Sequence, residues 1–370
     1  MKAKSVLFIT IATILFLGGC APKQSFDLKM TIEPLSGIYT EKFFNFGETG
    51  NIITKRLINL GIDSENIDLR TFTDRMILTI AKIDTAKTEV VEKLITVPGK
   101  IEFWETYENS EVLPFLLQAN IRLGEMKVNA DDVAEEKAKE TIAVDTSLKE
   151  NSEITDLINA DTTGDASAKE YKINNPLFAI LNPRIDANGQ PLQSCLIGLV
   201  ALKDTAKVNR YLGMKELNYI FPRDLRFYWS HSPYKYDETQ TLFELHAIKA
   251  TYLLGDAPLS GDVIVSAKAI TIKNRSDVRL DLSMNHEGAM KWGNITKENI
   301  NRCIAVVIDG YVRSYPRVMN EITGGNTEIT GNFSLAEAQY LSAILSSGSE
   351  IPPLKLQVIG KQVLQHKKDP

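Results

Sequence analysis

One cysteine of this sequence stands in a setting that suits covalent modification of its thiol. Cys20 directly follows a Gly-Gly pair, and before the pair lie Lys2, Lys4 and an apolar run over residues 5–17. About 13 residues make only ~20 Å of helix, too short to cross the ~30 Å hydrocarbon core of a membrane. The pattern predicts a signal peptide over residues 1–19 that is cleaved before Cys20, whose thiol is then acylated and anchors the chain. The alternative is an ordinary signal peptide with a chance cysteine.

A second set of residues has the composition of a binding strip. Tyr311, Arg313 and Tyr315 alternate along the chain, so a strand would place them on one face. Aromatic and Arg side chains concentrate binding energy at protein interfaces. The strip is therefore predicted to contact an extended chain or a partner. Alternatively, the tyrosines cover a helix or simply suit a strand.

Enzyme chemistry finds little support in the sequence. Glycines near the C-terminus do not form a phosphate-binding loop between a strand and a helix, and the nearby serines lack a Gly-x-Ser-x-Gly context. Glu102 and Glu105 would lie on opposite faces of a strand, which suits solvation better than acid–base work. Neither catalytic residues nor a cofactor are expected. Metal binding is not expected either, because the four histidines form no cluster with metal-ligand spacing: His231, His246, His286 and His366.

Two further cysteines, Cys195 and Cys303, lie in unrelated apolar contexts without CxxC spacing. Buried free Cys residues behave as small hydrophobic side chains. Two buried free thiols are expected, and a disulfide between them stays open.

Charge and hydropathy limit the partners. The 370 residues carry a net charge of −5, and removal of residues 1–19 leaves 40 basic against 47 acidic side chains, a net charge of −7. This excess of acidic side chains argues against binding to nucleic acid and against binding to a membrane surface through a polybasic patch. The longest apolar stretch after the signal peptide is residues 196–202, so no second membrane anchor is expected.

The first part of the chain reads as alternating helices and strands. A helical face over 51–60 ends at Gly61, and two strands over 67–83 flank a short turn. A helix that starts at Asp84 or Thr85 precedes a strand over 100–106. This α-β-β-α-β order predicts a small α+β sandwich.

Residues 128–170 differ in composition. Twelve Asp or Glu face four Lys, and the segment has no aromatic residue before Tyr171. Such a segment cannot bury enough apolar area to offset the entropy of ordering it. It is predicted to be a disordered or frayed helical insert, with a charged arm for a partner as the alternative.

The C-terminal third has the clearest pattern. A strand over 278–284 leads to a helix capped by Asn285, and Ser334 with Glu337 predicts a capping box for a later helix. Between these helices, Asp309-Gly310 signals a tight hairpin. The order is β-α-β-β-α, with its later strands at 303–308, 311–318 and 327–330.

These runs resemble a known family. Five motifs occur in the order found in the first periplasmic domain of the SecD/SecDF protein-export factors: Ser283–Trp292 with Thr296–Ile300, Ile304–Val312, Ser314–Val318, Glu321–Gly325 and Ile329–Phe333. The stretches 255–263 and 101–107 agree, so the resemblance covers about residues 30–360. It implies an α+β fold of two ferredoxin-like sandwich subdomains, a base and a head. It also implies that turns or hinges lie at Gly255, Gly261, Gly310, Gly324 and Gly325.

The resemblance predicts a division of the chain. After the signal peptide, the expected parts are a lipidated tether (20–29), a first part of the base (30–127), the acidic insert (128–170), a connecting region (171–254), the head (255–360) and a polar tail (361–370). Two departures from the family are expected. A lipoprotein signal replaces the first transmembrane helix, and no channel follows, so the chain has no proton coupling of its own.

The expected function follows from this kinship. The chain is predicted to be a lipid-anchored envelope protein facing the periplasm, and an accessory of protein export. Its partners would be the membrane, through acyl chains on Cys20, and Sec translocon subunits or unfolded exported protein. The alternative is a stand-alone binding lipoprotein with another partner, and a hydrolase is a distant third. Ala21 after Cys20 hints at the outer membrane, but the choice of membrane stays open.

Overall fold

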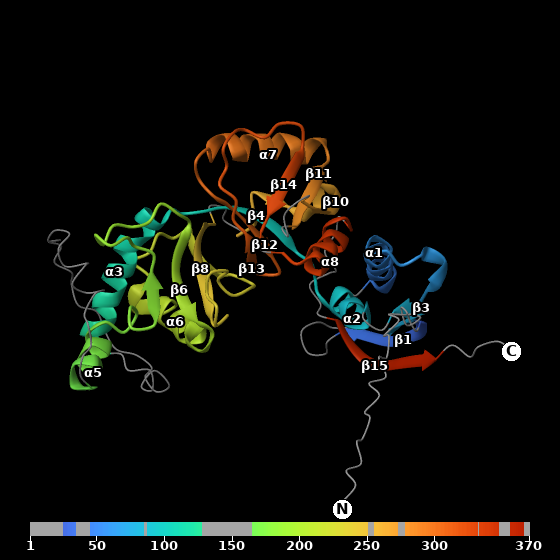
Figure 1. The fold of residues 1–370 in the computed structure, drawn as a ribbon, viewed down its shortest axis with the longest axis horizontal. Helices are drawn as coiled ribbons and strands as arrows, with labels where there is room; N and C mark the ends of the chain where they lie inside the picture. The colour runs from blue at the N-terminus through green and yellow to red at the C-terminus, as the bar shows by residue number, and fades with distance from the viewer. Residues whose placement is uncertain are drawn as a thin grey trace, which may run out of the picture.

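The computed structural model describes residues 25–34, 45–84, 87–127, 165–250, 255–272, 278–331, 333–347 and 356–365. Within these residues the chain is mixed α/β with four antiparallel sheets, which confirms the predicted fold class. Figure 1 shows three groups of elements along the longest axis. The predicted signal peptide, Cys20 and residues 128–164 lie outside the described residues. In the described part of the chain, no helix is long and apolar enough to cross a membrane.

The terminal sheet, named for the chain ends that it joins, has the strand order β15-β1-β3-β2. In β1, every second residue from Leu28 to Ile32 has no exposed surface, which is the period-2 pattern of a strand with one buried face. The predicted helix and hairpin are confirmed, and Gly61 follows the first helix with φ +83°. The elements are β1 (Ser25–Pro34), α1 (Phe46–Asn59), β2 (Ile67–Thr71), β3 (Met76–Asp84), α2 (Thr88–Thr96) and β15 (Leu356–Gln365).

The end strands of this sheet extend past two of the predicted divisions. Residues 25–29 belong to β1 rather than to a tether, and residues 361–365 belong to β15 rather than to a polar tail. The two strands pair from Phe26 opposite Gln365 to Pro34 opposite Leu356. Backbone pairing with β1 orders this polar segment. The pairing also covers the edge of β1, whose backbone N–H and C=O groups would otherwise have no partner.

The upper sheet has the order β10-β11-β14 and carries two helices. Asn285 caps the first helix as predicted, since its side chain accepts a hydrogen bond from Gly288 N at 2.8 Å. Ser334 caps the second by accepting from Glu337 N at 3.1 Å, but the Glu337 carboxylate pairs with Arg313. The elements are β10 (Ile264–Thr271), β11 (Val278–Met284), α7 (His286–Glu298), β14 (Asn326–Thr330) and α8 (Leu335–Leu345).

The central sheet, β13-β12-β4-β9, combines strands from both predicted subdomains. Because β4 pairs with β12, it does not complete the sandwich of β2 and β3, and the ferredoxin-like detail is not confirmed. Both Phe103 and Trp104 of β4 are buried, as expected for a strand covered on two faces. The strands are β4 (Ile101–Glu105), β9 (Leu259–Ser260), β12 (Ile304–Ile308) and β13 (Tyr311–Ser314).

The side sheet, β5-β6-β8-β7, has a core of its own. Helix α5 begins at Asp165, inside the range predicted as an acidic insert, so residues 165–170 are helical. The elements are α3 (Asn109–Glu125), α5 (Asp165–Asn174), β5 (Leu181–Pro183), β6 (Leu196–Ala201), α6 (Thr205–Leu212), β7 (Leu225–Trp229) and β8 (Leu242–Lys249). Short 3₁₀ turns complete the described chain: η2 (Ser64–Asn66), η5 (Leu202–Asp204), η6 (Lys215–Leu217) and η7 (Gly261–Val263).

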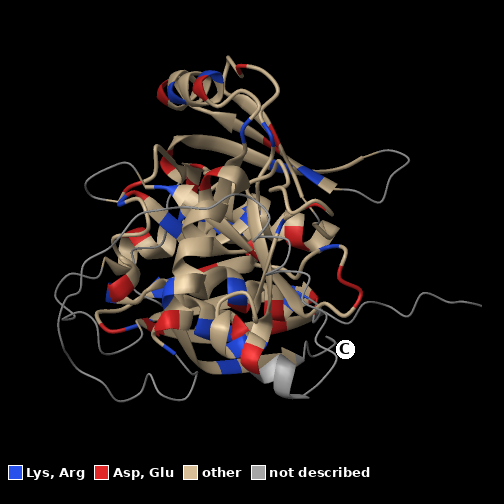
Figure 2. Ribbon diagram, turned by 90° about the vertical axis from the view of Figure 1, so that its left-hand side faces the viewer, with Lys and Arg blue, Asp and Glu red and all other residues tan. Residues whose placement is uncertain are grey.

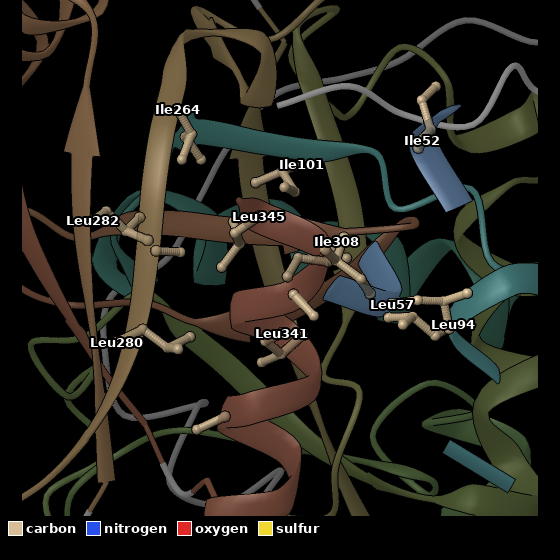
Figure 3. Close-up of a cluster of buried hydrophobic side chains, with 14 of the residues drawn as sticks. Ile52, Leu57, Leu94, Ile101, Ile264, Leu280, Leu282, Ile308, Leu341 and Leu345 are labelled. Carbon is tan, nitrogen blue, oxygen red and sulfur yellow. The ribbon is translucent and has the colours of Figure 1, made fainter. Parts of the chain in front are cut away.

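Helix α8 lies at the centre of the largest core. Leu341 and Leu345 have no exposed surface, and Figure 3 shows them between Leu280 of β11 and side chains of α1 and α2. Ile308 of β12 belongs to the same core. One continuous apolar cluster therefore joins the terminal, upper and central sheets, and this rigid block positions strand β13 and the surface beside it.

Candidate binding site

A groove of about 500 Å³ opens where the side, central and upper sheets meet. One wall is the loop after β7, another is β13, and the third is the chain after β14 with the start of α8. Its lining includes Tyr234, Tyr236, Glu244, Arg313, Tyr315 and Phe333. Two of the three predicted strip residues, Arg313 and Tyr315, thus line this groove.

The predicted strip is divided by its contacts. Tyr311 is 49% exposed, whereas Arg313 pairs with Glu337 at 3.2 Å and keeps only 10% of its side chain exposed. Tyr315 donates its hydroxyl hydrogen bond to Glu244 Oε1 at 3.0 Å. The exposed part of Tyr311 can meet a partner, while Arg313 and Tyr315 shape the groove from within. Their role in binding stays a prediction.

A buried polar network forms the floor. Glu244 of β8 accepts from Tyr315 and lies 3.3 Å from His246 Nε2, and the rings of His246 and Tyr315 are 4.5 Å apart. Burial, together with the nearby Glu244 carboxylate, raises the pKa of Tyr315. The phenol therefore stays protonated and holds β8 against β13.

Aromatic side chains that the sequence reading passed over form the rim. Tyr234 and Tyr236 stack edge to face with ring centroids 5.5 Å apart, and Tyr236 is 72% exposed. Arg184 lies over the Tyr234 ring at 5.6 Å, and Lys235 lies over Tyr236 at 5.0 Å. In the sequence, the Tyr-Lys-Tyr run over residues 234–236 could have indicated this rim. Exposed aromatics next to cations suit side chains of an extended polypeptide.

Asp237 holds this rim in place. Its carboxylate accepts from Thr239 Oγ1 at 2.6 Å, Thr241 N at 2.6 Å and Leu242 N at 2.8 Å. These hydrogen bonds, led by that of Thr239, lower the pKa of Asp237 to about 2. The loop is therefore pinned at neutral pH.

The predicted turn glycines lie around the central and upper sheets. Gly261 begins η7, and an added Cβ there would come within 3.0 Å of Ile101 Cβ, so it allows close packing of η7 on β4. At Gly325 an added Cβ would lie 2.8 Å from Ala289 Cβ, and φ is +72°. Positive φ also occurs at Gly255, Gly310 and Gly324. A hinge role for these five glycines stays a prediction.

His231 connects the groove to β13. Its backbone N donates to Val312 O at 3.0 Å, and its ring meets Tyr311 edge to face at 6.1 Å. Desolvation, followed by the positive charges of Arg313 and Lys93, lowers the pKa of His231 to about 4. The folded chain therefore keeps this imidazole neutral at pH values where an unfolded chain would protonate it.

His231→Asn is expected to flatten the dependence of stability on pH. Between pH 6.5 and 4 the unfolded state binds the additional proton, so the wild-type chain loses stability as the pH falls through this window. Solvent screening on the exposed side limits the loss to about 0.5–1 kcal/mol. Urea unfolding of both proteins at pH 4.5 and 7.5 tests this. An equal loss of stability between pH 7.5 and 4.5 in both proteins would contradict this expectation. Above pH 7 the protonation of His231 is expected to make no difference to the stability of either protein.

A second hollow, of about 730 Å³, lies between α6 and β7. Two of its polar side chains are already paired, since Asn209 accepts from Trp229 Nε1 at 2.8 Å and Arg226 donates to the carbonyls of Arg223 and Leu225. It also holds no predicted site residue. The groove at β13 is the better candidate.

Charged residues of both signs are interspersed along the chain. In the ribbon view of Figure 2, Lys and Arg positions lie among Asp and Glu positions and form no large basic cluster. Recognition through the groove would therefore depend on aromatic and backbone contacts more than on long-range attraction.

Comparisons with known proteins find similarity to SecD and SecDF proteins. Residues 239–350 match the family model of the SecDF P1 head subdomain, which confirms the resemblance for the C-terminal third. Protein translocase subunit SecD of Rhodothermus marinus is 29% identical over 314 residues, which cover 82% of this chain and 44% of that protein. SecD of Acidaminococcus fermentans is 39% identical over 105 residues, covering 28% of this chain and 24% of that protein.

A crystal structure of SecDF in a super-membrane-facing form is 15% identical, with a TM-score of 0.46, and the alignment covers 93% of this chain and 32% of that chain. The chain spans less than half the length of the two SecD proteins compared above.

Proposed function

We propose that this chain is a lipid-anchored protein of the bacterial envelope that assists protein export by holding unfolded segments of exported chains in the groove at β13. It would do so as a binding protein, without catalysis. The acyl chains would be attached to Cys20, and the groove would face the periplasm. Sec translocon subunits are the second class of proposed partner.

One observation carries the proposal. The part of the chain that matches the SecDF P1 head subdomain, residues 239–350, supplies β13, Glu244 and most of the groove. An exposed aromatic rim over a polar floor suits an unfolded chain, because aromatic faces accept many side chains while backbone groups find hydrogen-bond partners.

The anchor is tested separately from the groove. Cells labelled with palmitate should incorporate label into the chain, and Cys20→Ser should abolish incorporation. If Cys20→Ser loses the label but still crosslinks through the groove, the anchor is confirmed and the groove works without it. Label retained in the variant would contradict the anchor.

Photocrosslinking tests the groove. A photoreactive phenylalanine derivative in place of Tyr236 is expected to give adducts with exported precursors in growing cells. The matched control is the same replacement at Tyr219, which is 62% exposed but lies at the other hollow. At least a fivefold higher yield of precursor adducts is expected at position 236. Equal yields would contradict the proposal, and adducts with one folded envelope protein would favour a stand-alone binding module.

A further inference from the structure

The two cysteines of the folded part meet although 107 residues separate them. Cys195 lies just before β6 and Cys303 just before β12, and both are buried, with 0% and 4% of their surfaces exposed. Each thiol lies near enough to the other to shift its pKa. The side sheet and the central sheet therefore bring two thiols together in a site closed to solvent.

The backbone around both cysteines is fixed from several directions. Asn109 N donates to Ser194 O at 2.7 Å, and Thr106 Oγ1 donates to Cys303 O at 2.8 Å, so the end of β4 holds both segments. Arg317 adds a second link, because it pairs with Cys303 through its backbone and donates to Gln193 O at 3.3 Å. The meeting of the thiols is thus built into the fold and does not depend on side-chain rotation alone.

We propose that Cys195 and Cys303 form a disulfide that joins the side sheet to the central sheet when the chain matures in contact with an oxidising disulfide. A disulfide requires the two sulfur atoms to come within ~2.05 Å, and the contacts of Thr106, Asn109 and Arg317 hold the two backbone segments side by side. Structural disulfides persist in oxidising compartments such as the periplasm.

The oxidation balances by thiol–disulfide exchange. One of the two protein thiolates attacks an external disulfide, and one external sulfur leaves as a thiol. The other protein sulfur then attacks the mixed disulfide and releases the second external thiol. Two protein thiols lose two electrons, and the external disulfide takes up both electrons and both protons.

In the folded chain the two thiols differ in acidity. The neighbouring Cys195 thiol and the positive charge of Arg317 lower the pKa of Cys303, whereas burial raises the pKa of Cys195. Since the pair is buried in the folded chain, the exchange belongs to folding, before the side and central sheets close over it.

The test uses the full chain carrying Cys20→Ser, so that Cys195 and Cys303 are its only thiols. The chain is refolded in a buffer of oxidised and reduced glutathione, then denatured and treated with a maleimide. Refolded chains are expected to take up no maleimide and to give a linked Cys195–Cys303 peptide by mass spectrometry. Reduction should lower the Tm by about 4–10 °C, because the bond closes a loop of about 110 residues.

Quantitative labelling of both thiols after oxidative refolding would overturn the proposal. So would a linked form whose Tm is equal to or below that of the reduced form. In Cys195→Ala and Cys303→Ala the Tm should not respond to reductant; if either variant fails to fold, the comparison of oxidised and reduced parent chain decides. The measurement needs neither an anchor nor an exported partner, so its outcome is separate from that of the proposed function.

Discussion

Arg56→Met is expected to lower the free energy of unfolding of the terminal sheet by about 3–5 kcal/mol. The Arg56 guanidinium has no exposed surface and donates to Leu94 O at 3.1 Å, Val97 O at 2.8 Å and Pro98 O at 2.6 Å. It therefore satisfies carbonyls at the C-terminal end of α2, which have no partner within that helix.

Burial is the main cause that lowers the pKa of Arg56 to about 10, and the nearby Asp309 opposes it. Because this value is still well above 7, the side chain stays charged at neutral pH. The φ of Gly99 is +74°, and an added Cβ there would collide with the Arg56 guanidinium. A methionine of similar length would fill the space but leave three carbonyls without donors.

Hydrogen–deuterium exchange of β1 and β3 peptides gives the measurement, because it reports on this sheet alone. Arg70→Met is the matched control, since the side chain of Arg70 is 71% exposed and pairs with Asp68. The control is expected to change stability by less than about 0.5 kcal/mol. Similar protection in wild-type and Arg56→Met chains would refute the role assigned to Arg56.

Glu244→Ala is expected to cost about 2–4 kcal/mol and to loosen the groove. The Glu244 side chain is 11% exposed and contacts both His246 Nε2 and Tyr315 Oη. Its removal leaves two partly or fully buried polar groups without a partner, and it releases β13 from β8. Precursor crosslinking from position 236 should fall at the same time.

Thermal unfolding and crosslinking yield, measured on the same preparations, test this expectation. Glu328→Ala is the control, because Glu328 pairs with Arg279 at 3.0 Å but is 55% exposed, and it should change little. Glu244→Gln should recover part of the loss, since an amide still accepts from Tyr315. A stable Glu244→Ala chain with wild-type crosslinking would show that the floor has no part in binding.

Local signals predicted local structure well. Asp309 and Gly310 have φ of +51° and +83°, as the hairpin turn requires, and Asn285 caps α7. Each of these features depends on residues within a few positions of one another, so the sequence contains the whole interaction.

Strand partners could not be predicted in the same way. Alternation shows that a segment is a strand, but any strand with a matching buried face could pair with it. The pairings of β4 with β12 and of β15 with β1 join segments about 200 and 330 residues apart. The prediction therefore kept nearby strands together, and the pairing of residues 26–29 with 362–365 was not foreseen.

The candidate site was predicted in part for the same reason. Alternation placed Tyr311, Arg313 and Tyr315 together, but the ion pair of Arg313 with Glu337 could not be read from spacing, because Glu337 also suited a cap. The aromatic rim comes from the side sheet, which reaches β13 through a bridge between Ser230 and Val312. Such contacts between sheets are a property of the tertiary fold.

The pairing of β15 with β1 also constrains when the chain can fold. About 270 residues separate β3 from β15, and at roughly 5–20 residues per second their synthesis takes ~15–50 s. During that time β1 has a partner on one side only, and its other edge is open to wrong pairing. The terminal sheet is therefore completed last, when β15 arrives. Until then, β1 is the segment most in need of protection from wrong pairing.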